Sequence, residues 1–138
     1  MKIIFWILIL FTLFTQCISA QNYSEDEKQI LILQDSRTLG ENNKLLNYLK
    51  SPEKTTVITA LNALANIGDS NTVDNIGDAL INGKEIQIRS VAAFALGQIP
   101  CNNSIDYLTK ALNSEQESET LISYLIPWEK SVRKTNYK

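Results

Sequence analysis

One part of this chain, residues 55–114, contains the same unit twice. When the sequence is shifted by 32 residues, residues 60–67 (ALNALANI) align with residues 92–99 (AAFALGQI). At the same shift, residues 73–80 (VDNIGDAL) align with residues 105–112 (IDYLTKAL). A fixed period between about 20 and 50 residues is typical of solenoid proteins, in which each unit packs on its neighbours. The repeat therefore predicts a stacked array.

Within each unit the apolar residues recur at helical spacing in two blocks, which predicts a pair of amphipathic helices. In residues 55–82 they are Val57, Ala60, Leu61, Leu64 and Ile67, followed by Val73, Ile76 and Leu80. In residues 87–114 they are Ile88, Val91, Ala92, Ala95, Leu96 and Ile99, followed by Ile105, Leu108, Ala111 and Leu112. One pair is too small to bury its own apolar face, so its stability must come from stacking.

A weaker copy of the unit precedes these two. Residues 25–27 (EDE) are expected to begin its first helix, because negative charge is favourable at a helix N-terminus. That helix is expected to end near Leu39-Gly40, because Gly is the usual residue just past a helix C-terminus, and Asn42-Asn43 is expected to start the second. In the next unit, Ser51 as N-cap and Pro52 at the first helical position predict a helix start.

The segments Val57–Asp69 and Ile88–Ile99 resemble the HEAT repeat, especially the short bacterial form first noted in bilin-lyase proteins. The A-L-G-x-I core after a Val/Ile-Arg pair carries this resemblance, although Val57 stands where Arg is common and Pro100 replaces the usual Gly. The resemblance implies an all-α fold, a right-handed α-α superhelix of about three helical hairpins plus an incomplete fourth. The second helices would line its concave face. The expected repeat domain covers residues 21–126.

The N-terminus reads as a secretory signal peptide over residues 1–20. Lys2 precedes a twelve-residue apolar run, residues 3–14, and a small-residue end at Ala20. A helix of twelve residues would reach about 18 Å, short of the roughly 30 Å of a bilayer core, so no stable membrane span is expected after cleavage. The alternative is a lipoprotein signal at Cys17, which the bulky residues before Cys17 disfavour. The sequence thus predicts an exported protein, periplasmic or secreted, cleaved after Ala20.

The C-terminal end departs from the repeat. Residues 120–126 (TLISYLI) begin a fourth unit, but residues 127–129 read Pro-Trp-Glu where the period predicts Leu-Gly at 128–129. Residues 127–138 are therefore an atypical basic tail. Two interpretations remain open: a polar capping tail, or a frameshift that makes the chain the N-terminal piece of a longer repeat protein.

Composition argues against catalysis. Histidine is absent, which removes the commonest general base and metal ligand. The two cysteines, Cys17 and Cys101, have no metal-site or redox-pair spacing, and no phosphate-binding loop is present, so we expect no cofactor, no metal and no enzymatic activity. The formal net charge is −2, with no basic run before the C-terminal tail, so nucleic acid is not an expected partner.

A helical wheel places one set of polar residues opposite the core on the second helices. The candidate partner-binding residues are Lys44, Asn47, Asn75, Asp78, Tyr107 and Lys110. The predicted function is a non-catalytic protein–protein interaction scaffold that binds through this concave face, as a monomer or with weak self-stacking. The alternative is the N-terminal non-catalytic fragment of a larger exported enzyme or lyase-like HEAT protein, truncated near residue 127.

Overall fold

The structure is a computed structural model that describes residues 23–114. The predicted signal peptide, the start of a fourth unit and the basic tail lie outside the described residues. The first helices of the three units are α2 (Glu25–Asp35), α4 (Lys54–Ile67) and α6 (Ile86–Gln98). The second helices are α3 (Lys44–Asn47), α5 (Val73–Asn82) and α7 (Asn102–Ser114). Three short 3-10 turns complete the described elements: η1 (Glu41–Asn43), η2 (Tyr48–Lys50) and η3 (Ser70–Thr72).

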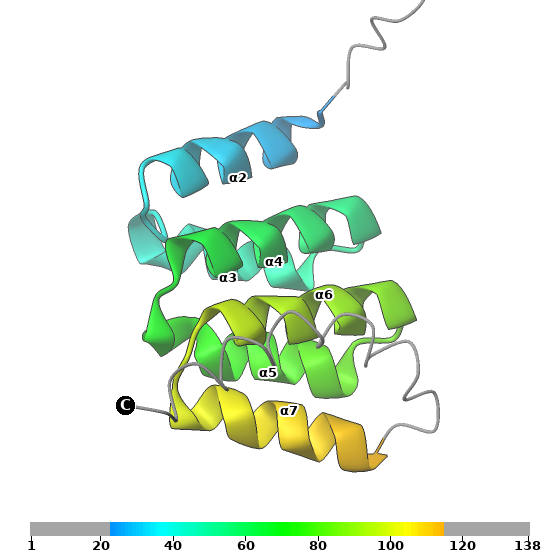
Figure 1. Ribbon diagram of the computed structural model, residues 1–138. Helices are drawn as coiled ribbons and strands as arrows, with labels where there is room; N and C mark the ends of the chain where they lie inside the picture. Colours follow the sequence, from blue (N-terminus) through cyan, green and yellow to red (C-terminus); the bar gives the residue numbers. More distant parts are fainter. Residues whose placement is uncertain (1–22, 115–138) are drawn as a thin grey trace, which may run out of the picture.

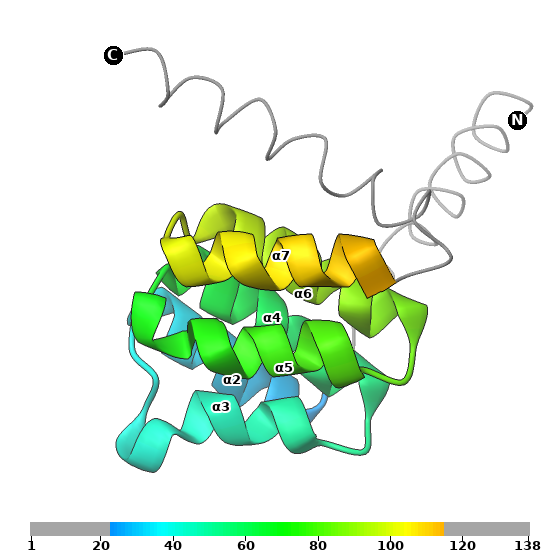
Figure 2. The ribbon, with the colours of Figure 1, turned by 90° about the horizontal axis from the view of Figure 1, so that it is seen from below.

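The helices form two layers. The first helices α2, α4 and α6 stack on one another, with α4 packed on both of its neighbours (Figure 1). The second helices α3, α5 and α7 lie side by side in the other layer (Figure 2). The prediction of similar helix pairs placed next to each other is therefore confirmed, and every regular element in residues 23–114 is helical.

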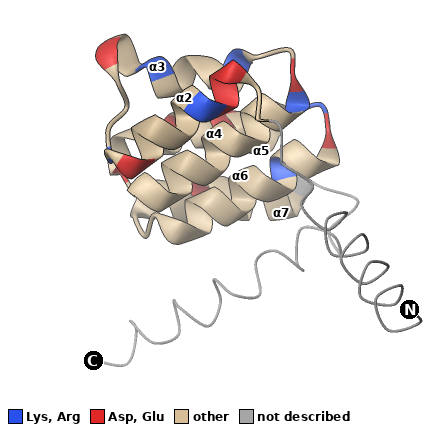
Figure 3. Cartoon of the chain, turned by 90° about the horizontal axis from the view of Figure 1, so that it is seen from above, with Lys and Arg blue, Asp and Glu red and all other residues tan. Residues whose placement is uncertain are grey.

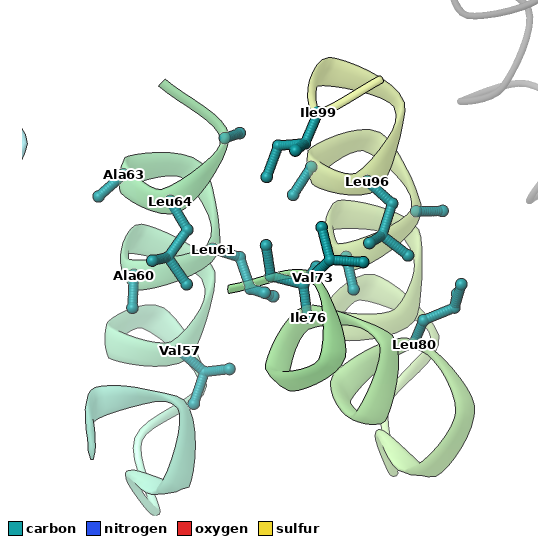
Figure 4. Packing of buried hydrophobic residues seen from close by; sticks show 14 of the residues in the cluster. Val57, Ala60, Leu61, Ala63, Leu64, Val73, Ile76, Leu80, Leu96 and Ile99 are labelled. Carbon is teal, nitrogen blue, oxygen red and sulfur yellow. The ribbon is translucent and has the colours of Figure 1, made fainter. Parts of the chain in front are cut away.

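One continuous apolar core joins the units, and most of the residues predicted for it are buried. Ala60, Ala63, Ala92 and Ala95 are all fully buried, and these small residues let the first helices α2, α4 and α6 pack closely in their layer. The second helix α5 packs mainly on α6, the first helix of the following unit, rather than on α4. Figure 4 shows this junction, where Val73 and Ile76 of α5 meet Leu96 of α6. Helix α5 is thus covered by the next unit, which makes stacking necessary for its burial.

Several helix ends follow the local sequence signals. Ser24 caps α2 in a reciprocal capping box, in which its Oγ accepts from the Glu27 amide at 3.2 Å and its amide donates to Glu27 Oε2 at 2.8 Å. Gly68 ends α4 in the left-handed conformation, with φ of 73°. Asp69 then caps the turn η3 by accepting from the Asn71 amide at 2.9 Å.

Two predictions in the first unit were wrong. Helix α2 ends at Asp35 rather than near Gly40, because Ser36 Oγ donates to the Ile32 carbonyl at 2.7 Å and Arg37 turns the chain with φ of 50°. The second helix was expected to start at Asn42-Asn43. Only Asn43 adjoins it, as the N-cap residue of α3, which begins at Lys44, and both asparagines have positive φ.

The expected start of α4 was also wrong. The helix begins at Lys54, and Ser51 is not its N-cap. Instead, Ser51 Oγ accepts from the Glu53 amide at 3.2 Å, which holds residues 51–53 in a turn before the helix.

Candidate functional site

Charged side chains are sparse on the first helices of the second and third units. Helices α4 and α6 each carry a single charged residue, Lys54 and Arg89, and each lies near the helix start. Figure 3 shows the rest of α4 and α6 without Lys, Arg, Asp or Glu, whereas α2 carries charges of both signs. The exposed side of α3, α5 and α7, here called the second-helix face, is therefore the surface with chemical variety.

The structure places the six predicted binding residues on this face. Five of them are exposed, and Tyr107 is half-buried. They fall into three separate hollows: Lys44 and Asn47 line one beside α2, Asn75 and Asp78 line one between η2 and α5, and Tyr107 and Lys110 line one between α5 and α7. The structure thus groups them in pairs and does not gather all six at one point.

The hollow between η2 and α5, here called the central groove, has a volume of about 400 Å³. Its lining includes apolar side chains from five elements, namely Leu46 of α3, Leu49 of η2, Val57 of α4, Ala79 of α5 and Ile88 of α6. Its polar lining comes from α5 and from the turns that precede α4 and α6. An apolar lining with a few polar groups around it is the usual composition of a binding groove.

Most charges around the central groove are already engaged. Lys54 Nζ lies 3.2 Å from Glu85 Oε2, which ties the start of α4 to the start of α6. Asn82 Nδ2 donates to Asp78 Oδ1 at 2.6 Å. By contrast, Lys50 and Lys84 have no ion pair within residues 23–114. Asp78 has no ion pair within these residues either, because the Asn82 amide is neutral, so the unpaired charges at this groove are two positive and one negative.

Tyr107 contributes to helix packing as well as to the face. Its ring lies over Gly77 of α5, so close that a Cβ at that glycine would be 2.5 to 2.6 Å from ring atoms. Its hydroxyl donates to Asp74 Oδ1 at 3.3 Å. Partial desolvation, and then the charge of Asp74, raise the pKa of Tyr107 above its ordinary value. Tyr107 is thus held in place by α5, which restricts its movement toward a partner.

The hollow beside α2, lined by Lys44 and Asn47, lies where the start of α2 meets α3 and η2. It is wide and open, at about 690 Å³, and Lys44, Asn47 and Tyr48 face Glu25 and Asp26 across it. Both charge signs are present there, so the hollow has no clear electrostatic preference.

Metal-ligating side chains are dispersed over the described part of the chain. Within residues 23–114, no group of three or more His, Cys, Asp or Glu side chains is placed to hold a metal ion. Cys101 Sγ lies 3.2 Å from Ser104 Oγ, but that hydroxyl donates to the Ile99 carbonyl at 2.7 Å and helps to close the turn before α7. In the same part of the chain, no helix is long and apolar enough to cross a bilayer.

The residues around the central groove were partly missed by sequence reasoning. Asn75 and Asp78 were identified because they lie on one face of a helix, but Lys50 and Lys84 lie at the ends of turns where a helical wheel does not apply. Their position in the repeat could have identified them, because each of these lysines closely precedes the first helix of the following unit. Only stacking brings them to the same groove.

Comparison with known proteins gives one match. A protein-family model described as HEAT repeats matches residues 42–123, more than half of the 138-residue chain. No curated protein and no solved structure matches the chain significantly.

Proposed function

The chain belongs to the HEAT repeat family, whose members are generally protein-interaction scaffolds and typically not enzymes, and we propose that it binds a protein partner through the second-helix face, without catalysis. The supporting observation is the central groove, where apolar side chains lie beside two unpaired lysines. In a superhelix curved as the family resemblance implies, this face is concave.

The chemistry of the central groove favours an extended, acidic segment of a partner protein. The apolar lining accepts one or two large apolar side chains of such a segment, which would gain roughly 1.5–3 kcal/mol for each side chain fully buried. Lys50 and Lys84 lie at the same groove as Asn75 and Asn82, so a carboxylate there meets both positive charge and amide donors. Charge complementarity of this kind sets specificity and the rate of association.

Panning a random peptide-display library against the full chain tests this proposal. Enriched peptides are expected to combine a large apolar residue with Asp or Glu a few positions away. The double substitution Lys50→Glu and Lys84→Glu is expected to weaken their binding at least about tenfold, since reversing charge at an interface costs on the order of 1.4 kcal/mol or more.

Lys28→Glu is the matched control, because Lys28 is an exposed lysine on α2 that lines none of the three hollows. The control is expected to leave affinity within about twofold, because an exposed pair of this kind contributes little. Enrichment of basic peptides, or equal losses in the control and the double variant, would contradict the acidic-segment proposal. Unchanged binding after charge reversal of both Asp78 and Lys110 would contradict binding through the second-helix face.

Export is part of the same proposal and rests on residues 1–20 of the sequence. Cell fractionation followed by mass spectrometry of the intact protein tests it. The expected mature protein starts at Gln21 and is found outside the cytoplasm. A lipid-modified N-terminus at Cys17 would support the lipoprotein alternative, and an uncleaved cytoplasmic chain would contradict export.

A further inference from the structure

Residues at equivalent positions of the two best repeats differ sharply in exposure. Val73 and Leu80 of α5 are each only 1% exposed. The residues 32 positions later on α7 are Ile105 and Leu112, which were expected in the core but are 41% and 38% exposed. The side chains are of similar size and occupy similar helices, so the difference must come from their surroundings.

The missing neighbour explains the difference. Helix α5 is covered by α6, the first helix of the following unit, and Figure 4 shows Val73 and Leu80 near that junction. Helix α7 has no such cover among the described residues 23–114, which end with α7 itself. Ile105 and Leu112 therefore mark an apolar strip along α7, here called the end strip, that lacks the helix its counterpart has.

The chain continues past α7 with a sequence that suits this position. At an offset of 33 residues, Leu121, Tyr124, Leu125 and Trp128 fall on the positions of Ile88, Val91, Ala92 and Ala95 in α6. These are the i, i+3, i+4 and i+7 positions of one helical face. Leu125 aligns with a buried alanine at either offset, Ala93 at 32 residues and Ala92 at 33.

The available length is also sufficient. Seven residues separate Ile105 from Leu112, which corresponds to about 10.5 Å along a helix. A helix of residues 119–128 would span about 15 Å. Pro127 interrupts a helix interior, but it comes at the end of this segment, after Leu121 and Leu125.

We propose that residues 119–128 of this same chain dock on the end strip as an incomplete fourth unit. Leu121 and Leu125 cover Leu112, and Trp128 extends toward Ile105. The docked segment closes the apolar end of the array and so removes a surface that would otherwise favour association with a second copy.

A double-mutant cycle in the full chain, with Leu112→Asp and Leu125→Asp, tests the docking. Leu125→Asp is expected to lower Tm by roughly 5–10 °C and to speed hydrogen exchange of the α7 amides about tenfold, because α7 loses its cover. The double variant is expected to be hardly less stable than Leu112→Asp alone, since the same contact is removed twice. Val132→Asp, beyond the segment, is the control for Leu125→Asp, and Ile32→Asp, an exposed isoleucine on α2, is the control for Leu112→Asp.

Each other outcome overturns the proposal. If Leu125→Asp matches Val132→Asp in Tm and in exchange, residues 119–128 do not cover α7. If the Tm shifts of Leu112→Asp and Leu125→Asp add up in the double variant, the two leucines do not share a contact. If light scattering shows a dimer that Leu112→Asp dissociates and Leu125→Asp does not, a second copy occupies the end strip instead. Hydrogen exchange remains informative if a double variant unfolds, since it is measured on the single variants.

Discussion

The contact between Gly77 and Tyr107 gives the sharpest prediction, because it joins two second helices 30 residues apart in sequence. In Gly77→Ala the new Cβ would lie 2.5 to 2.6 Å from the Tyr107 ring, whereas carbon atoms in good contact are about 3.5–4.0 Å apart. The ring must move by about 1 Å, and overpacking of this kind costs about 1–3 kcal/mol. Alanine also gains about 1 kcal/mol over glycine from helix propensity. The net effect in the native chain is therefore a loss of about 0–2 kcal/mol.

The background Tyr107→Ala separates the two effects. Without the ring only the helix-propensity gain is left, so Gly77→Ala is expected to stabilise that variant by about 0.5–1 kcal/mol. Urea unfolding of all four chains measures the cycle, with equal m-values as the check that the unfolded states are comparable. A gain of the same size in both backgrounds would refute the reasoning, because it would mean that the ring does not lie over Gly77.

Three further predictions concern the core, a helix end and pH. Leu64→Ala should cost about 2–5 kcal/mol by thermal unfolding, while Ile32→Ala stays within about 0.5 kcal/mol, and equal losses would contradict the assigned core. Gly68→Ala should cost about 1–2 kcal/mol through its positive φ alone, since nothing lies within 4 Å of the added Cβ, and Gly68→Asn should cost less; a neutral alanine would contradict the left-handed cap. The raised pKa of Tyr107 means that the folded state favours the neutral phenol. The stabilisation that Tyr107 gives to the folded state is therefore present at neutral pH and is lost as pH rises above 10 through the folded-state pKa. Urea unfolding at pH 8 and at pH 11 should therefore show a smaller fall in the free energy of unfolding for Tyr107→Phe than for the native chain. Equal falls would contradict the raised pKa of Tyr107.

The regular part of the fold could be predicted from the sequence because the same physical signal occurs twice. Leu64 and Leu96 occupy the same position of two first helices, and both are fully buried. The first unit lacked a second copy to fix its alignment. There, the side-chain hydrogen bonds of Ser36 and the positive φ of Arg37 and Asn42 determine where the helices end. The spacing of apolar residues does not predict such local interactions.

Only the candidate residues whose placement depends on helical geometry could be named from the sequence. Asn75 and Asp78 follow from the wheel of α5, and both are exposed at the central groove. Lys50 and Lys84 reach the same groove through the packing of consecutive units, which a single helix does not encode. Tyr107 was predicted as a binding residue from the wheel of its own helix, yet its ring is packed on α5, because Gly77 leaves space for it.

The central claim is that consecutive units stack so that their second helices lie side by side and form one face. A nuclear Overhauser spectrum of the full chain tests it most directly, through the Tyr107 ring protons and the α protons of Gly77. The account predicts strong cross-peaks between them, because the ring lies directly over that glycine. Assigned resonances for both residues with no cross-peak would contradict the stacking of α5 and α7, and with it the proposed binding face.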